Sequence, residues 1–458
     1  MPVAQSYGAF NWGYDGVLWY APSAAYGPPE AFKAFIDAAH GLGLMVCLDV
    51  VYNHFGPVGN HLSELGPAFS ASHESPWGPG LNLDGPGSEM VREFICQNAL
   101  YWLREFRLDG LRIDAAHMIF DDSPRHLLAE LTERARRAHP GRSLHLIAEN
   151  SDNEASWLTR EASGEPKFFT AQWNDDLHHA LHAAATGEVT GYYADFAPDE
   201  PGFSRIGRAL AEGYAFQGEH KRHEERDCGT PSAHLPPTAF VSYMQNHDQV
   251  GNRVRGSRIH HYAPPEAVRA FSTVVLLAPQ IPLLFMGEEV AARTPFPFFS
   301  DMPPELRQDI LEGRKEELLK TPEPEDPRRP DPDATLDPCD PASFQAAKLN
   351  HSETPEEPGA EWRAFVRELI ALRQREIVPR LRGIGGHSGS YIRTGPLAVC
   401  VTWAMGDGSR LRLRLNLSEQ AQWGLPPPES RLLRRKGEAG PDRLGPWSLD
   451  FSLSGTGT

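Results

Sequence analysis

Paired cysteines are missing from this chain of 458 residues. Its five cysteines are odd in number and scattered, without any C-x-x-C motif: Cys47, Cys96, Cys228, Cys339 and Cys400. We therefore expect buried or free thiols in a reducing compartment, not a disulfide framework. The opening residues, MPVAQSYGAFNWGYDG, have neither a basic head nor an apolar core, so they do not read as a secretory signal. A cytoplasmic location is the expectation.

Basic charge is scarce, and long apolar runs are absent. The chain has 44 basic and 61 acidic residues, for a formal net charge of −17. This balance disfavours nucleic acid or an anionic membrane as a partner, because few groups could neutralise phosphates. The most apolar stretch, FSTVVLLAPQIPLLFMG, is interrupted by Pro279 and Pro282 and is too short to span a bilayer. We expect a small-molecule substrate and no membrane or nucleic-acid partner.

Short apolar runs alternate with helix-like segments through the first two thirds of the chain. The runs cover residues 44–51, 111–115, 144–148, 168–173, 239–244 and 281–286. Helices are predicted at 30–42, 88–106 and 124–138, the last after an Asp-Asp-Ser start signal. Most runs are apolar throughout, which is typical of parallel strands covered on both faces. The pattern predicts an α/β fold, with a TIM-type (β/α)8 barrel as the leading candidate.

The amino-acid composition and the hydrophobic pattern of the chain change after Phe298. Residues 321–358 are rich in Pro, Asp and Glu and are interpreted as a long surface excursion, and a helix is predicted at 361–375. Strand-like sequences around the turn GDGS then predict a small all-β sandwich domain. We expect a catalytic barrel over 1–383 and a C-terminal domain over 384–458. The polar run 218–237 contains His-Glu-Glu-Arg and reads as a solvated loop more than as a metal site.

Four of the apolar runs end in polar residues, at the strand ends where barrel enzymes place their chemistry. The groups are Asp49, Asn53 and His54; Arg112, Asp114 and His117; Glu149 and Asn150; and Asn246, His247 and Asp248. Glycoside cleavage needs one carboxyl group to protonate the leaving oxygen and another to attack or to activate water. The order of these groups fits that chemistry.

Position suggests a role for each carboxylate. Arg112 lies two residues before Asp114, so both side chains should lie on the same face of the strand, where a cation would keep Asp114 ionised. Glu149, at the end of an apolar strand, is placed to have a raised pKa and to act as an acid. Taken singly, each carboxylate could be a helix cap or an ion pair, and each histidine a core residue. The aromatic residues near the strand ends could stack on sugar rings or only pack: Trp12, Tyr14, Tyr52 and Trp77.

The segments that carry these groups resemble the signature segments of the α-amylase family of glycoside hydrolases. They are DVVYNH (49–54), GLRIDAAH (110–117), IAEN (147–150) and QNHDQ (245–249). The resemblance implies Asp114 as nucleophile, Glu149 as proton donor and Asp248 as transition-state stabiliser. It places Arg112, His54 and His247 at the sugar. The remaining polar members of the segments are expected to bind substrate: Asp49, Asn53, His117, Asn246 and Gln249.

A finer resemblance points to the trehalohydrolase subfamily. It rests on NWGYDGVLWYAPSAAYG, AQWNDDLHH (171–179), GYYADF and FMGEEVAARTPFPFFSD, and it runs from Asn11 to about Asp301. It implies cleavage, with retention, of the α-1,4 bond next to the terminal trehalose of maltooligosyltrehalose. Trp12, Tyr14, Asn174, Asp175 and Asp176 become candidate substrate-binding residues, although a helix cap explains the Asn-Asp-Asp run equally well. No metal ion and no organic cofactor is implied.

The chain departs from this subfamily at its beginning. Relatives carry an N-terminal β-sandwich domain, a first barrel strand and its helix before the segment that matches MPVAQSYG. We therefore expect a barrel without its first strand and helix, and a true start upstream in preference to a fragment.

Two other functions stay open. A glycogen-branching or amylase-type enzyme shares the motifs WND and MGEE. A branching transferase would differ from a hydrolase because a sugar hydroxyl, and not water, receives the glycosyl group. A non-catalytic carbohydrate-binding or partner-binding protein on the same scaffold would typically lack catalytic carboxylates.

Overall fold

A curled parallel sheet forms the centre of the computed structural model, which describes residues 1–197, 204–320, 336–353 and 359–455. Its strand order is β12–β11–β8–β7–β6–β3. The strands are β3 (Cys47–Val50), β6 (Gly110–Ile113), β7 (His145–Ala148), β8 (Ala171–Trp173), β11 (Phe240–Tyr243) and β12 (Ile281–Leu283). Each of the six apolar runs overlaps one of these strands, and the order in the sheet follows the order in the chain, as in a barrel.

The sheet stays open on one side. Beyond β3, a single parallel bridge joins Pro2 to Asp49, and the following residues form an antiparallel pair, β1 (Ala4–Gln5) with β2 (Leu18–Pro22). Within the described residues, no bridge connects β12 to Pro2. The barrel prediction is thus confirmed as a six-stranded part of a barrel, in which Pro2 marks the place of the neighbouring strand.

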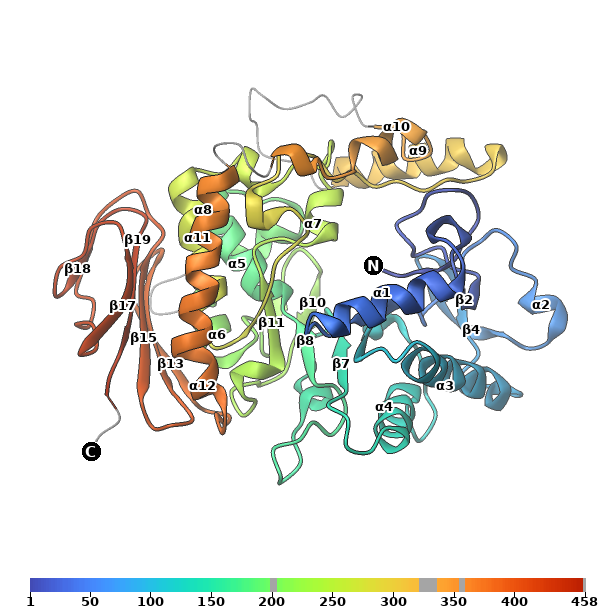
Figure 1. Ribbon diagram of the computed structural model, residues 1–458, viewed down its shortest axis with the longest axis horizontal. Coiled ribbons are helices and arrows are strands. Elements are labelled where there is room, and N and C mark those ends of the chain that lie inside the picture. Colours follow the sequence, from blue (N-terminus) through green and yellow to red (C-terminus); the bar gives the residue numbers. More distant parts are fainter. Residues whose placement is uncertain (198–203, 321–335, 354–358, 456–458) are drawn as a thin grey trace.

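Helices cover the outside of the sheet, with α3 and α4 at the lower right of Figure 1 and α5 and α8 nearer its left. The helices of this part of the chain are α1 (Pro29–Gly41), α2 (Leu62–Leu65), α3 (Ser88–Glu105), α4 (Leu127–Ala138), α5 (Asp175–Thr186), α6 (Arg205–Glu212), α7 (His247–Gly251) and α8 (Pro265–Leu277), of which α2 and α7 are short turns in the loops. The predicted start of α4 at residue 124 is wrong by three residues. His126 caps the helix, while the Asp121 carboxylate accepts a hydrogen bond from the Leu127 amide.

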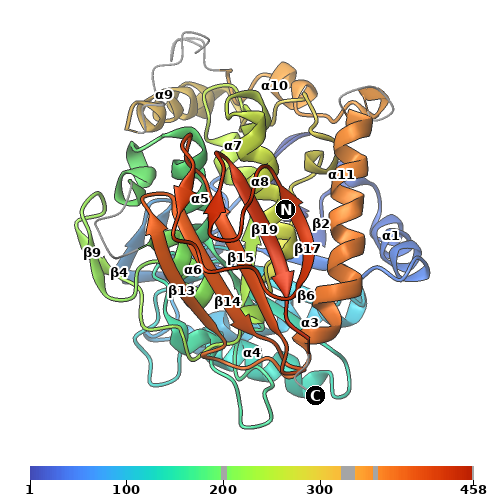
Figure 2. The ribbon, with the colours of Figure 1, turned by 90° about the vertical axis from the view of Figure 1, so that its left-hand side faces the viewer.

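The C-terminal strands form a separate antiparallel sheet of order β13–β14–β15–β19–β17. Its strands are β13 (Gly389–Gly395), β14 (Ala398–Ala404), β15 (Arg410–Asn416), β17 (Arg431–Lys436) and β19 (Ser448–Leu453), with a small second pair of β16 (Gln422–Trp423) and β18 (Arg443–Leu444). Helices α6, α8 and α11 (Gly359–Leu372) lie between this sheet and the barrel (Figures 1 and 2). The chain leaves that layer through a π-helical turn (Arg373–Ile377) and α12 (Val378–Leu381). The domain boundary at 383/384 stays a prediction.

The predicted excursion is partly an ordered piece of the fold. Residues 321–335 and 354–358 lie outside the described residues, but α10 (Pro341–Ala346) falls between them. The Phe344 ring stacks on Phe10, with centroids 5.3 Å apart, and both α10 and α9 (Pro304–Lys320) lie along the top of Figure 1. The proline-rich and acidic composition of this segment therefore gave no indication that Phe344 packs on Phe10.

Two hairpins project from the loops. The polar run at 218–237, predicted to be a loop, contains β9 (Glu219–Lys221) paired with β10 (Arg226–Cys228). A second hairpin joins β4 (Phe69–Ser75) to β5 (Gly78–Leu81). All five cysteines are free thiols, as expected. Among the described helices, none has the length and hydropathy needed to cross a membrane.

Candidate active site

A cleft of about 1120 Å³, open to solvent, lies at the carboxyl ends of the central strands. Its lining includes the three predicted carboxylates, Asp114, Glu149 and Asp248. It also includes the predicted residues Trp12, Tyr14, His54, Trp77, His117 and His247. Residues from 12 to 248 in the chain thus meet because parallel strands bring their carboxyl ends to one face of the sheet.

Arg112 binds the carboxylates together. Its Nη1 lies 2.7 Å from both Asp49 Oδ1 and Asp114 Oδ1, and its Nη2 lies 2.6 Å from Glu149 Oε2. Trp173 covers the guanidinium, 4.4 Å from ring centroid to Cζ. Arg112 is only 4% exposed, so one buried cation sets the positions of three carboxylates.

The carboxylates of Asp114 and Glu149 differ in the hydrogen bonds that they accept. Both Asp114 oxygens accept hydrogen bonds, Oδ1 from Arg112 and Oδ2 from the Asn53 amide at 3.0 Å. The contacts of Glu149 within the described residues fall on Oε2, which also accepts from the Ala115 amide at 2.8 Å. Ala115 has φ = 36°, a left-handed conformation that costs energy and aims this amide at Glu149. Asp114 is therefore held through both of its oxygens, whereas Glu149 keeps one oxygen for a proton.

Burial dominates the titration of the cluster. It raises the pKa of Glu149 to about 7, against the lowering effect of Arg112 and with further raising from Asp248 and Asp175. Burial likewise raises the pKa of Asp114 to about 7, again opposed by Arg112. The separated pKa values expected from the sequence are therefore not present in the free protein, where the carboxyl groups share protons as a set. Desolvation within the cleft also raises the pKa of Asp248 to about 7, with further raising from Asp114.

These raised pKa values predict a stability cost at alkaline pH. A carboxyl group with a pKa near 7 in the folded state and about 4.5 unfolded loses stability as pH rises through that window. Glu149→Gln removes one of the three carboxylates around Arg112 and should raise the thermal midpoint at pH 8 by roughly a few degrees. The gain should shrink at pH 5, where Glu149 is already protonated. Calorimetry at both pH values checks this; a variant that melts lower at pH 8 would contradict it.

Neutral imidazoles and aromatic rings form the walls of the cleft. His247 Nε2 lies 2.8 Å from the Tyr14 hydroxyl, which donates to Asp49 Oδ2 at 2.9 Å. The His247 ring stacks on Tyr14, and burial lowers the pKa of His247 to about 3. On the opposite side, the His54 ring stacks on Trp77 with centroids 4.9 Å apart, and burial lowers the pKa of His54. The neutral imidazoles of His247 and His54 can each donate a hydrogen bond to a sugar hydroxyl or accept one from it.

Several predicted binding residues make contacts within the fold, and their role in substrate binding stays a prediction. Asn246 and Gln249 form a capping box at the start of α7, which fixes the direction of Asp248. Asn174 caps α5 and donates to the Gly213 carbonyl, while Asp176 accepts from two backbone amides, Ala215 and Phe216. Asn174 is thus the N-cap of α5, whereas Asp176 holds the loop after α6.

Asp175 differs from its two neighbours in the run. Its carboxylate accepts hydrogen bonds from the Tyr243 hydroxyl and from Gln249 Nε2, and burial raises its pKa to about 6. Asp175 also contributes to the raised pKa of Glu149, so it lies next to the carboxylate set. Tyr52, predicted at the mouth, is buried in the core and bonds Asn98.

No sequence motif indicates the part of the cleft that α9 contributes. Arg314 and Glu317 line it together with Asn11, Asp15, Asn252 and Phe298. Arg314 donates to Asn252 Oδ1 at 2.8 Å and to the Gly251 carbonyl at 2.6 Å, and so ties α9 to the end of α7. A polar helix after the last barrel strand carries no local signal of such a contact.

We expect Arg314→Ala to weaken substrate binding more than catalysis. Losing the two hydrogen bonds frees α9 from α7, and KM should rise about tenfold, on the order of 1.4 kcal/mol, with kcat within about twofold. Gln308→Ala, on the exposed face of the same helix, is the matched control. Steady-state kinetics decide; an unchanged KM would show that α9 does not shape the substrate site.

Solved structures of other proteins share this fold. A crystal structure of a Salmonella typhimurium protein assigned to the alpha amylases superposes with a TM-score of 0.92 at 44% identity, over 99% of this chain and 75% of that one. A pullulanase from Anoxybacillus shares the fold at a TM-score of 0.62 and 17% identity. The family model "Domain of unknown function (DUF3459)" matches residues 386–449. The fold and the relatives define a glycoside hydrolase of the α-amylase class.

Curated relatives specify the family within that class. The malto-oligosyltrehalose trehalohydrolase of Arthrobacter ramosus is 42% identical over 89% of this chain and 70% of its own length. That of Mycobacterium tuberculosis is 41% identical over 82% of this chain and 63% of its own length. The chain belongs to the malto-oligosyltrehalose trehalohydrolase family, and it spans about two thirds of the length of these relatives.

Proposed function

We propose that this chain hydrolyses the α-1,4-glucosidic bond next to the terminal trehalose of maltooligosyltrehalose and releases free trehalose. The observation that carries the proposal is the contact of Asp114 and Glu149 with one guanidinium at the cleft floor. Such a pair, with one anion well supplied with donors, suits a retaining double displacement. We infer the substrate from the relatives, which are named malto-oligosyltrehalose trehalohydrolases.

The reaction follows from the placement of the groups. Glu149 donates its proton to the glycosidic oxygen while Asp114 attacks C1 of the sugar, so the C1–O bond breaks and trehalose leaves. The maltooligosyl unit is then a β-configured ester of Asp114. Glu149, now a carboxylate, takes a proton from water, which attacks C1 and restores the α-configuration and the free Asp114 carboxylate. Asp248 stabilises the positive charge that develops at C1 in both steps.

Free trehalose is the product that tests this proposal. Purified protein is incubated with maltotriosyltrehalose, with maltopentaose as the control, and the products are separated by chromatography. We expect equimolar trehalose and maltotriose from the first substrate and much slower cleavage of the second. Comparable cleavage of both would favour an amylase-type activity, and new α-1,6 links without reducing sugar would favour a branching enzyme. Binding without turnover of either substrate would favour a carbohydrate-binding protein.

The proposal includes the cellular location of the enzyme and the class of its partners. Five free thiols and a net charge of −17 suit a cytoplasmic enzyme that acts on a neutral saccharide and does not bind nucleic acid.

A further inference from the structure

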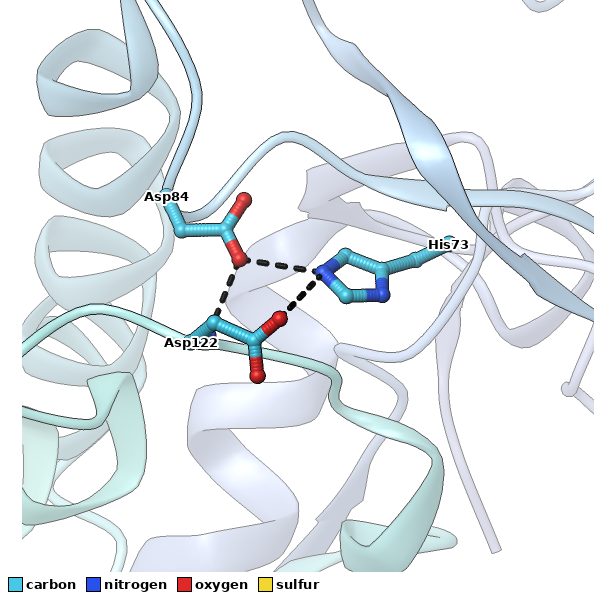
Figure 3. Close-up of side chains that lie close together, drawn as sticks. All are labelled: His73, Asp84 and Asp122. Atoms are coloured by element: carbon cyan, nitrogen blue, oxygen red, sulfur yellow. Dashed lines mark hydrogen bonds and ion pairs between the residues drawn. The ribbon is translucent and has the colours of Figure 1, made fainter.

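A second group of polar side chains lies outside the cleft, where the β4–β5 hairpin meets the barrel. His73 on β4, Asp84 before α3 and Asp122 in the loop before α4 point toward one another (Figure 3). His73 Nε2 lies 3.0 Å from Asp84 Oδ2 and 3.5 Å from Asp122 Oδ2. All three potential ligand atoms lie within 4.8 Å of one another. We propose that they bind a divalent transition-metal ion of the zinc class, which fastens the hairpin to the barrel.

The spacing fits that ion. Zinc–nitrogen and zinc–oxygen bonds of 2.0–2.2 Å in a tetrahedron place neighbouring ligand atoms roughly 3.3 Å apart. The two distances from His73 Nε2 lie on either side of that value. An imidazole with two carboxylates favours zinc over calcium or magnesium, which prefer oxygen ligands alone. Asp122 is exposed, which leaves room for water as the fourth ligand.

The charges are unbalanced without an ion. Across the described parts of the chain, the ion pairs of Asp84 and Asp122 are both with His73. One imidazole supplies at most one positive charge against two carboxylates. The nearby Arg92 contacts Asp121 and Glu130 instead. A divalent cation would neutralise both carboxylates and displace the proton from His73 Nε2.

The ligands are already held in position. The Phe120 ring stacks on the imidazole with centroids 5.6 Å apart, and the Asp122 amide donates to Asp84 Oδ2 at 2.9 Å. Gly80 on the paired strand passes close to His73, where a Cβ atom would lie 3.2 Å from the His73 Cβ. Little rearrangement is therefore needed for binding, which lowers its entropic cost.

The same hairpin carries Trp77, which stacks on His54 in the cleft. An ion at this place would tie the hairpin, and with it one wall of the cleft, to the loop that follows the strand of Asp114. This role is separate from the chemistry of the carboxylates, so its test does not depend on the proposed function.

Titration of the metal-free full chain with ZnCl2, followed by calorimetry, tests the site. We expect one equivalent to bind with a micromolar or lower Kd and to raise the thermal midpoint. Co²⁺ should give the visible absorption of a tetrahedral site. His73→Gln and Asp122→Asn should each weaken binding at least tenfold; Asp122 is exposed, so its variant is expected to fold normally.

His220→Gln serves as the matched control, because His220 also pairs with an aspartate, Asp227, at 2.9 Å on an exposed hairpin. It should bind zinc as the unmodified chain does. The proposal is overturned if the chain shows no saturable binding, or if binding survives in both the His73 and Asp122 variants.

Discussion

Replacing Asp114 by asparagine is expected to lower kcat for trehalose release by about 10⁴-fold or more, with little change in KM. The amide lacks the negative charge that attacks C1, yet it keeps the size of the carboxylate, and its oxygen can still accept the hydrogen bond from Arg112, while the one from Asn53 is lost. Substrate should still bind, because the rings that form the walls of the cleft are untouched. Single-turnover measurements of trehalose formation would record the loss.

Asp152→Asn is the matched control for this prediction. Asp152 is a partly exposed carboxylate close after β7 that pairs with Arg226 outside the set of catalytic groups. It should retain nearly full activity, and both variants should give native-like melting curves. A kcat for Asp114→Asn within tenfold of the unmodified protein would remove Asp114 from the role of nucleophile.

Glu149→Gln is expected to show a loss that depends on the leaving group. With maltooligosyltrehalose, kcat should fall by about 10² to 10⁴-fold, because no proton reaches the glycosidic oxygen. With α-maltosyl fluoride, fluoride departs without protonation, so the first-turnover burst of fluoride should remain close to that of the unmodified chain. Rapid-quench kinetics with both substrates make the comparison.

The pattern across the two substrates is the decisive feature. Asp114→Asn should lose the burst with the fluoride as well, since both leaving groups need the nucleophile. Equal losses on both substrates for Glu149→Gln would argue against its role as proton donor and for a purely electrostatic one.

Repeated elements that have a local sequence pattern could be predicted from the sequence. Parallel strands covered on both faces read as apolar runs, and so all six strands could be predicted. The residues that follow them converge because the sheet brings strand ends to one face, and this is why Asp114, Glu149 and Asp248 line one cleft. The shared contact of Asp114 and Glu149 with Arg112 agrees with their spacing in neighbouring strands.

Features that depend on contacts between distant residues could not be predicted. The hydrogen bonds from Arg314 to the end of α7 join segments 62 residues apart, and no local pattern marks them. An Asn-Asp-Asp run has the same appearance whether it binds a sugar or caps a helix, and the contacts of Asn174 with Gly213 and of Asp176 with Ala215 exist only in the folded chain. The similar pKa values of Asp114 and Glu149 arise from burial of the whole set, which the order of residues does not reveal.

Trapping the covalent intermediate tests the central claim most directly. The Glu149→Gln variant, incubated with a ring-fluorinated α-maltosyl fluoride, should form the glycosyl ester quickly and hydrolyse it slowly. After digestion at low pH, mass spectrometry of the peptides should locate one maltosyl unit on Asp114. A sugar attached to Asp248 or to another residue, or turnover without any attached sugar, would contradict the account.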